Sequence, residues 1–251
     1  MAISSVAVLT ATAGRDVLAR CVDSIRSQAT SLPIRHYLMT DAGVMHSPDY
    51  MELRRRFPHC SVSYWDAPAG RGDEGQPLEG RRLYAAAAGL VDEDAVLMLN
   101  DDDWFEPDHV QSLVDLLDSG NDWAFSLRKI YDKDGAYLFE DNCEALGCWP
   151  VWNAPAYEPS YLIEHSAFCL KREVFQALGG VFNYQGYGVD RVFTATLKEH
   201  RPNYACSLRH SLCYSLGGNP GSVQAEFFVA GNQVMKDRYP KGFPWREQVQ
   251  P

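Results

Sequence analysis

The order of apolar and amphipathic segments constrains the fold of this chain more than any other feature. Four short apolar segments predict buried strands, at residues 5–11, 34–40, 61–65 and 95–99. Helical spacing of apolar side chains predicts helices at residues 15–28, 48–57, 79–91 and 107–117. Strands that alternate with helices pair in parallel and carry the helices on both faces of the sheet. The sequence therefore predicts an α/β fold with a mostly parallel central sheet flanked by helices.

The C-terminal half has a different pattern. The turn sequence Asp132-Lys133-Asp134-Gly135 separates two strand-like segments and predicts a hairpin. Strands are expected at residues 123–130, 136–139, 162–170 and 204–216, and helices at 171–178, ending at Gly179-Gly180, and at 190–199. We expect irregular structure at residues 141–160 and in the tail from Gly217. No repeat or linker divides the sequence, so we predict one domain, residues 1–251, with a smaller mixed β region in its C-terminal half.

Composition and charge exclude several classes of protein. The 251 residues are 46% hydrophobic, but no run approaches the ~18 apolar residues of a membrane span, so we expect no integral membrane segment. The net charge is −10, from 23 basic and 33 acidic side chains, and this balance disfavours binding to nucleic acid. Seven cysteines without a Cys-x-x-Cys pair are typical of reduced thiols, so we expect a cytoplasmic protein without a zinc site.

Three adjacent carboxylates, Asp101, Asp102 and Asp103, follow the fourth predicted strand. In an open parallel sheet, ligands bind beyond the carboxyl ends of the strands, where these residues meet the segments 10–15 and 40–43. The segment that follows the first predicted strand lacks the dinucleotide-binding pattern G-x-G-x-x-G, and the pattern G-x-x-x-x-G-K-[ST] of NTPase loops does not occur in the sequence. Hard cations bind one or two carboxylates together with substrate phosphates. The cluster therefore predicts a Mn²⁺ or Mg²⁺ site that serves a phosphate-containing ligand.

Three segments, in this order and spacing, resemble family 2 glycosyltransferases with the nucleotide-diphospho-sugar transferase A fold. VAVLTATAGRDVLARCVDSIRSQ resembles the family's first strand, nucleotide loop and first helix. LMLNDDDWFEPDHV resembles its D-x-D-D strand end, and GGVFNYQGYGVDRVFTATL resembles its Gly-Gly-Phe segment and acidic helix start. The resemblance implies a single glycosyltransferase A-type domain with a nucleotide-binding half, about residues 1–120, and an acceptor-binding half, about residues 121–251.

The resemblance also implies roles for individual residues. Asp102 is the main metal ligand, and Asp190 is the general base of an inverting sugar transfer. The donor is a nucleotide-diphosphate sugar, with a UDP-sugar favoured, and the acceptor is a saccharide or another hydroxyl compound. The residues implied to bind the donor are Thr10, Ala11, Thr12, Arg15, Asp41 at the base, Arg81 or Arg82 near the diphosphate, and Asp101 and Asp103 near the ribose, sugar or metal.

Four further residues have two interpretations each. His210 is expected as an additional metal or phosphate contact, and His165 borders the expected acceptor site. Trp149 and Trp152 offer flat aromatic faces that suit sugar rings. In the alternative interpretation, the histidines are buried structural residues and the aromatic side chains form a hydrophobic cluster that holds a long loop.

Two positions depart from the family pattern. Asn100 stands where the family has the first aspartate of its D-x-D motif, and Val189 stands where it has a glutamate before the base. Asp190 is alternatively an ordinary acidic residue at a helix N-terminus. Two other functions therefore stay open: a nucleotide-sugar-binding protein without transfer activity, and a metal-dependent phosphohydrolase or nucleotidyltransferase.

Overall fold

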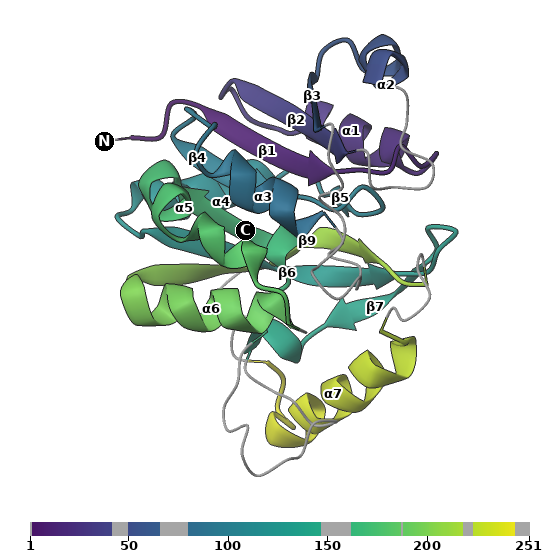
Figure 1. Ribbon diagram of the computed structural model, residues 1–251. Coiled ribbons are helices and arrows are strands. Elements are labelled where there is room, and N and C mark those ends of the chain that lie inside the picture. Colours follow the sequence, from purple (N-terminus) through teal and green to yellow (C-terminus); the bar gives the residue numbers. More distant parts are fainter. Residues whose placement is uncertain are drawn as a thin grey trace.

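The computed structural model describes residues 2–41, 50–65, 80–146, 162–186, 188–217 and 223–243. Within these residues one sheet has the order β3-β2-β1-β4-β8-β6-β9-β5, and β7 pairs with β6 beside this path. Its strands are β1 (Val6–Ala11), β2 (Ile34–Asp41), β3 (Ser61–Trp65), β4 (Ala95–Met98), β5 (Trp104–Phe105), β6 (Trp123–Tyr131), β7 (Tyr137–Asp141), β8 (Phe168–Lys171) and β9 (Tyr204–Ser215). Figure 1 shows the curled sheet at the centre of the molecule.

The first half of the sheet is parallel, as the alternation of segments predicts. β1 pairs in parallel with β2 on one side and β4 on the other, and β2 pairs in parallel with β3. In the second half, β8 is antiparallel to β4 and β6, β9 is parallel to β6, and β7 and β5 are antiparallel to their neighbours. The predicted single α/β fold with a smaller mixed β region is therefore confirmed.

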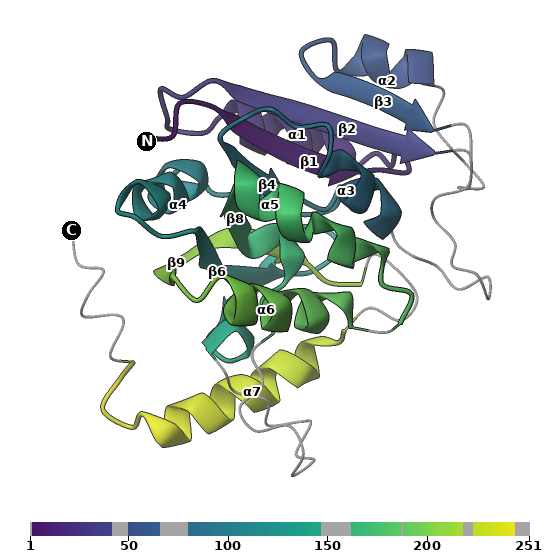
Figure 2. The same cartoon turned by 60° about the vertical axis from the view of Figure 1, so that its left-hand side comes forward.

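Helices cover both faces of the sheet. The helices are α1 (Leu18–Arg26), α2 (Tyr50–Arg56), α3 (Arg81–Ala87), α4 (His109–Asp118), α5 (Arg172–Leu178), α6 (Val189–His200) and α7 (Ala225–Arg238), with short 3₁₀ turns η1 (Glu144–Leu146), η2 (His165–Ala167) and η3 (Gly179–Asn183). In Figures 1 and 2, α3, α5 and α6 lie on one face and α1 and α4 on the other. Both faces of the central strands are thereby removed from water, which explains their continuous apolar sequences.

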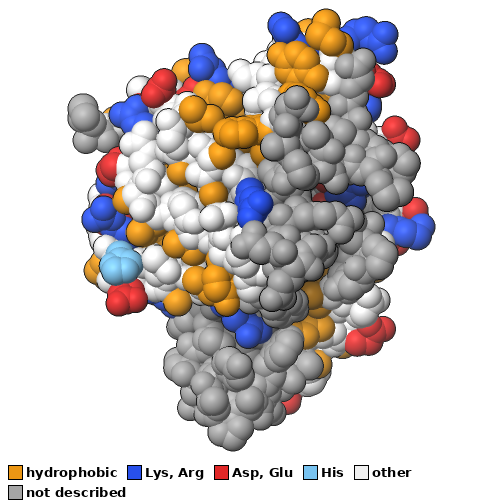
Figure 3. Space-filling view, viewed as in Figure 1, with side chains coloured by type: hydrophobic (Ala, Val, Ile, Leu, Met, Phe, Trp, Pro, Cys, Tyr) orange, Lys and Arg blue, Asp and Glu red, His pale blue; other side chains and the backbone are white. Residues whose placement is uncertain are grey.

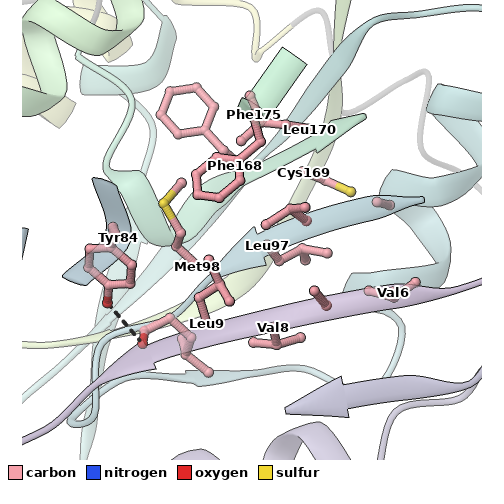
Figure 4. Packing of buried hydrophobic residues seen from close by; sticks show 14 of the residues in the cluster. Val6, Val8, Leu9, Tyr84, Leu97, Met98, Phe168, Cys169, Leu170 and Phe175 are labelled. Atoms are coloured by element: carbon pink, nitrogen blue, oxygen red, sulfur yellow. Dashed lines mark hydrogen bonds between the residues drawn. The ribbon is translucent and has the colours of Figure 1, made fainter. Parts of the chain in front are cut away.

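The core forms where β1, β4 and β8 lie side by side. Val8, Leu9, Leu97, Met98 and Phe168 are fully buried there, and Figure 4 shows their side chains packed together with a helical layer above. Complete burial of one such aliphatic or aromatic side chain contributes about 1.5–3 kcal/mol. This packing fixes the positions of the strand ends from which the candidate site is built.

Two predictions for the C-terminal half are wrong in detail. The strand expected at 162–170 begins only at Phe168, because the Glu164 side chain accepts a hydrogen bond from the Ser166 amide and caps the turn η2. The tail expected to be irregular contains the helix α7. The helix expected at 171–178 is confirmed as α5, which ends at Leu178 before Gly179; a Cβ at Gly179 would lie 2.7 Å from the Cβ of Ala88, so glycine permits close packing. Parts of the expected segments at 48–57, 79–91 and 141–160 lie outside the described residues.

The surface carries both signs of charge. Among the described side chains on the face seen in Figure 3, blue basic and red acidic groups are interspersed, with no continuous basic patch. None of the described helices is long and apolar enough to cross a membrane.

Candidate active site

The carboxyl ends of β1 and β4 bring Arg15 against two aspartates. Arg15 forms ion pairs with Asp101 and Asp102, the second with 3.0 Å between Nη2 and Oδ2. Thr12 Oγ1 donates a hydrogen bond to Asp101 Oδ2 over 2.8 Å and accepts one from the Gly14 amide. Because β1 and β4 are adjacent and parallel, the segments that follow them meet at one edge of the sheet. The structure thus places Thr12, Arg15, Asp101 and Asp102 in one cluster.

Asp103 has a different environment from the other two aspartates. Its side chain is buried, and its Oδ1 accepts a hydrogen bond from the Ser215 amide over 2.8 Å. Its Oδ2 accepts one from Asn100 Nδ2 over 3.1 Å. Burial, followed by the charges of Asp102 and Glu164, raises the pKa of Asp103 well above its ordinary value. Asp103 therefore links the end of β4 to β9, and both of its oxygens are engaged by protein groups.

A chain of hydrogen bonds connects the end of β4 with the start of α6. Asn100 Oδ1 lies 2.9 Å from His165 Nε2, and His165 Nδ1 lies 3.2 Å from Asp190 Oδ1. Glu164 Oε1 lies 3.0 Å from the same Nδ1 atom and accepts a hydrogen bond from Asn100 Nδ2 over 3.2 Å. Two predicted site residues, His165 and Asp190, are therefore in contact, although 25 residues separate them in the sequence.

The charged groups along this chain of hydrogen bonds stabilise one another. Burial by itself lowers the pKa of His165, but the Glu164 charge and the hydrogen bond with Asp190 outweigh it, and the pKa lies well above its ordinary value. Burial by itself raises the pKa of Glu164, but the charges of His165 and Arg128 outweigh it and lower that pKa. Both shifts favour the ionised pair, in which a His165 imidazolium lies between the carboxylates of Glu164 and Asp190.

The start of α3 lies against the end of β1. A Cβ at Gly80 would lie 2.3 Å from the Cβ of Ala11, and Gly80 has φ +77°, so only glycine fits both requirements. Arg81 Nη1 donates to the carbonyl of Gly186 over 3.0 Å, which ties α3 to the segment before α6. The Ala11 amide donates to the Tyr84 hydroxyl over 3.3 Å. Ala11 and Arg81 therefore belong to the wall between the cluster at β1 and the segment that leads to Asp190.

Three other predicted donor-binding residues lie on β1, β2 and α3. Thr10 is fully buried and its Oγ1 lies 2.9 Å from His36 Nε2. Asp41 is buried at the carboxyl end of β2, where it pairs in register with Trp65 of β3. Arg82 is half-buried on α3 beside Arg81. Of these, Asp41 lies at the carboxyl end of β2, at the same edge of the sheet as the segment that follows β1.

His210 is not near the predicted metal ligands. Its Nε2 lies 3.1 Å from Asn142 Oδ1, and it lines a cavity of about 430 Å³ with Lys129 and Glu140. It lies five residues before Ser215, the β9 residue that contacts Asp103. At about 3.3 Å per strand residue, this spacing separates the two positions by roughly 16 Å. Trp149 and Trp152 lie outside the described residues.

The arrangement of the three aspartates leaves one of them, Asp102, as a ligand for a divalent cation. Both oxygens of Asp101 and of Asp103 are engaged by protein groups, and no described group of three or more His, Cys, Asp or Glu side chains is arranged to hold a metal ion. Asp102 contacts Arg15 through Oδ2, and 17% of its side chain is exposed. Asp102 is therefore the residue that would hold a cation, with phosphate and water oxygens as the other ligands, the arrangement Mg²⁺ commonly has.

Several residues of this site were not among the candidates from the sequence. Glu164 caps η2 and contacts His165, Asn100 was treated only as a departure from the family pattern, and Tyr84 packs against His165 with ring centroids 5.4 Å apart. The sequence offers one signal for Glu164: an acidic residue beside a histidine in an otherwise apolar segment. Tyr84 has no such signal, because its place on an alanine-rich helix suggests only packing.

Comparisons with solved structures identify the fold. No protein-family model matches the sequence, and no curated protein matches it. The chain is similar to S. aureus TarS, residues 1–349, with a TM-score of 0.59 and 11% identity over 84% of this chain and 60% of that chain. For TarS 1–349 in complex with UDP-GlcNAc, the TM-score is 0.60 and the identity 11%, over 94% of this chain and 66% of that chain. For the complex with UDP the values are 0.56 and 10%, over 94% and 72%.

The similarity covers nearly all of this chain, whereas the chain spans less than two thirds of the first two TarS structures. An identity near 11% supports a conclusion about the backbone arrangement only. This protein therefore has the same α/β fold as TarS, with a mostly parallel sheet flanked by helices.

Proposed function

We propose that this chain is a glycosyltransferase that moves a sugar from a UDP-sugar to a hydroxyl group of a saccharide or another acceptor, with inversion at the anomeric carbon. In this proposal the nucleotide binds to the half of the domain formed by residues 1–120, and the acceptor to residues 121–251. The fold supports the proposal, because TarS has been solved with UDP-GlcNAc and with UDP.

The observation that carries the proposal is the connection between Asp102 and Asp190. Asp102 is two residues from Asn100, and Asn100 contacts Asp190 through His165 at distances of 2.9 and 3.2 Å. A partly exposed carboxylate at the strand end and a second one at the start of α6 are thus linked through Asn100 and His165. Sugar transfer requires these two groups, one where the diphosphate leaves and one where the acceptor loses its proton.

The chemistry follows from the charges of the reacting groups. The acceptor oxygen forms a bond with the anomeric carbon while the bond from that carbon to the β-phosphate oxygen breaks, and UDP leaves with the electron pair. Asp190 takes the proton of the acceptor hydroxyl, a contribution of about 10²–10⁴-fold to the rate. Mn²⁺ or Mg²⁺ at Asp102 supplies positive charge for the leaving diphosphate when it is bound. Arg15 adds a fixed guanidinium beside Asp102.

One observation favours binding without transfer. Arg15 contacts both Asp101 and Asp102, so its guanidinium already neutralises carboxylates that are proposed to face a cation. A site of this kind would hold a nucleotide diphosphate through the arginine without catalysing departure of the sugar. Turnover separates the two functions, since both bind UDP-GlcNAc and only the transferase releases UDP.

The test combines binding and turnover. A thermal-shift series with UDP-GlcNAc, GDP-mannose and UDP, each with and without Mn²⁺, measures binding, because a ligand at about 100 times its Kd stabilises the folded state by about 2.7 kcal/mol. Release of UDP from UDP-GlcNAc, with water or added saccharides as acceptors, measures transfer. We expect stabilisation by UDP compounds that increases with Mn²⁺, and UDP release that Asp190→Asn suppresses. Absence of any shift with all three nucleotides would contradict the proposal.

A further inference from the structure

His165 faces a hydrogen-bond acceptor with each ring nitrogen. Nε2 lies 2.9 Å from Asn100 Oδ1, and Nδ1 lies 3.2 Å from Asp190 Oδ1. The Asn100 amide has one consistent orientation, because its Nδ2 points at the carboxylates of Asp103 and Glu164, at 3.1 and 3.2 Å. Its oxygen must therefore face His165. A ring that meets an acceptor at both nitrogens donates from both, and only the imidazolium form does so.

We infer that His165 is a positioning residue for Asp190: it holds Oδ1 of that carboxylate and thereby directs Oδ2 toward the acceptor hydroxyl. This inference rests on the proposed function and adds a residue to it. His165 itself does not contact the donor in this scheme, because both of its nitrogens are engaged by protein groups and only 15% of its side chain is exposed.

The surroundings of Asp190 show why a positioning group is needed. Asp190 lies in the first turn of α6, directly after Gly188 and Val189, and 23% of its side chain is exposed. Val189 provides no polar group at the position before the base. Among the described residues, the contact from His165 is the hydrogen bond that the Asp190 carboxylate receives. A carboxylate on the first turn of a helix is otherwise free to rotate, and a misplacement of 1 Å costs up to about 10²-fold in rate.

The ring of His165 is held from several sides. Tyr84 and Phe182 pack on it with centroid distances of 5.4 and 6.2 Å, and Glu164 Oε1 lies 3.0 Å from Nδ1. The same Glu164 side chain is fixed by the amide of Ser166, which it caps at 2.8 Å. The ring therefore has little freedom to rotate. Its hydrogen bond with Asp190 Oδ1 in turn restricts the rotation of that carboxylate.

The transfer step needs no proton from His165 and leaves its protonation unchanged. The proton of the acceptor hydroxyl moves to Asp190 Oδ2, the acceptor oxygen bonds to the anomeric carbon, and UDP leaves with the electrons of the broken bond. His165 keeps both of its protons throughout. His165 contributes by positioning the Asp190 carboxylate. Removal of His165 therefore lowers kcat and leaves the KM for the donor unchanged.

The test measures UDP release from UDP-GlcNAc with Mn²⁺ for the full chain and four variants. They are His165→Gln, Asp190→Asn, the double variant, and His109→Gln as a control for replacement of a buried histidine outside the site, since His109 contacts Ser211. We expect His165→Gln to lower kcat by about 10–10²-fold with little change in KM. In the Asp190→Asn background the same substitution has no further effect, because the group through which His165 acts is already gone.

Several results would overturn the inference while the proposed function stands. They are a raised KM with unchanged kcat in His165→Gln, an unchanged kcat, or losses that multiply in the double variant. The proposed function itself fails if Asp190→Asn keeps full activity. If His165→Gln does not fold, ¹H–¹⁵N spectra of the unsubstituted protein test the geometry at pH 7.5: protons on both ring nitrogens of His165 are expected, and a neutral ring would contradict it.

Discussion

The side-chain amide of Asn100 donates a hydrogen bond to the buried carboxylate of Asp103, with 3.1 Å between Nδ2 and Oδ2. The same Nδ2 reaches Glu164 over 3.2 Å, and the amide oxygen accepts from His165 over 2.9 Å. Asn100 therefore connects Asp103, at the acidic end of β4, with His165, which contacts the proposed base Asp190. The asparagine at this position has a physical reason, because its amide donates to Asp103 and Glu164, both of which a carboxylate would repel.

An aspartate at position 100 is expected to destabilise this protein. In Asn100→Asp a third carboxylate faces Asp103 and Glu164, and the hydrogen bonds from Nδ2 are lost. Repulsion raises the pKa of the introduced group in the folded state, so the protonated form is favoured and stability is lost as pH rises through that value. Urea denaturation at pH 5.5 and pH 8 should show a larger deficit relative to the wild type at pH 8. An equal deficit at both pH values would contradict this account.

Removal of the Asp102 carboxylate should abolish the effect of metal on donor binding. Asp102 is the partly exposed aspartate of the cluster, and its Oδ2 faces Arg15 over 3.0 Å. In Asp102→Asn we expect the thermal shift with UDP-GlcNAc to become independent of Mn²⁺, while the melting temperature of the free protein changes little. Asp92→Asn, on an exposed turn, is the matched control and keeps the response to Mn²⁺. If Asp102→Asn keeps the normal response of the thermal shift to Mn²⁺, the cation does not bind at Asp102.

A buried ion network should hold α7 on the sheet. Arg128 pairs with Asp141 at 2.8 Å and with Glu144, and it stacks on Phe228 of α7 at 4.9 Å. Arg128→Met leaves two buried carboxylates without their partner, which costs about 3–5 kcal/mol. Urea denaturation measures the loss, and hydrogen exchange should show α7 opening first. Lys133→Ala removes an exposed ion pair and should leave the midpoint unchanged.

His36 should make the protein less stable in mild acid. Its ring is buried against Thr10, and burial lowers its pKa from 6.5 to about 3. The folded state therefore keeps His36 neutral while the unfolded chain binds a proton below pH 6.5. The neutral ring therefore makes its full contribution to the free energy of unfolding above pH 6.5. This contribution decreases as pH falls toward 3, by at most about 1.4 kcal/mol per pH unit.

The measurement for His36 compares wild type and His36→Gln by urea denaturation between pH 7.5 and 4.5. The deficit of the variant should shrink as pH falls, because only the wild type loses the contribution of the neutral ring. His200→Gln replaces an exposed histidine on α6 and serves as the control. A deficit for His36→Gln that stays constant over this range would show that the ring does not titrate as inferred.

Local sequence patterns were sufficient for the parallel half of the fold. The apolar segments that became β1, β2, β3 and β4 were predicted to within one or two residues at each end, and the two-residue strand β5 was missed. Continuous apolar runs identify central strands because both faces of such strands are buried. The helix α7 was missed because its apolar side chains have no strong helical spacing; Phe228 packs on Ile130 and Phe139, whereas Val229 is exposed.

The sequence by itself determined the elements of the N-terminal half, the acidic end of β4 and the candidate residues Asp102 and Asp190. Only the tertiary structure decided how these groups are partnered: Arg15 contacts Asp101 across 86 residues, and Ser215 contacts Asp103 across 112. Such partners are set by the order of strands in the sheet, which no local pattern encodes. The charge state and the direction of a buried side chain depend on those partners, so the arrangement of His165 between Asn100 and Asp190 became visible only in the folded chain.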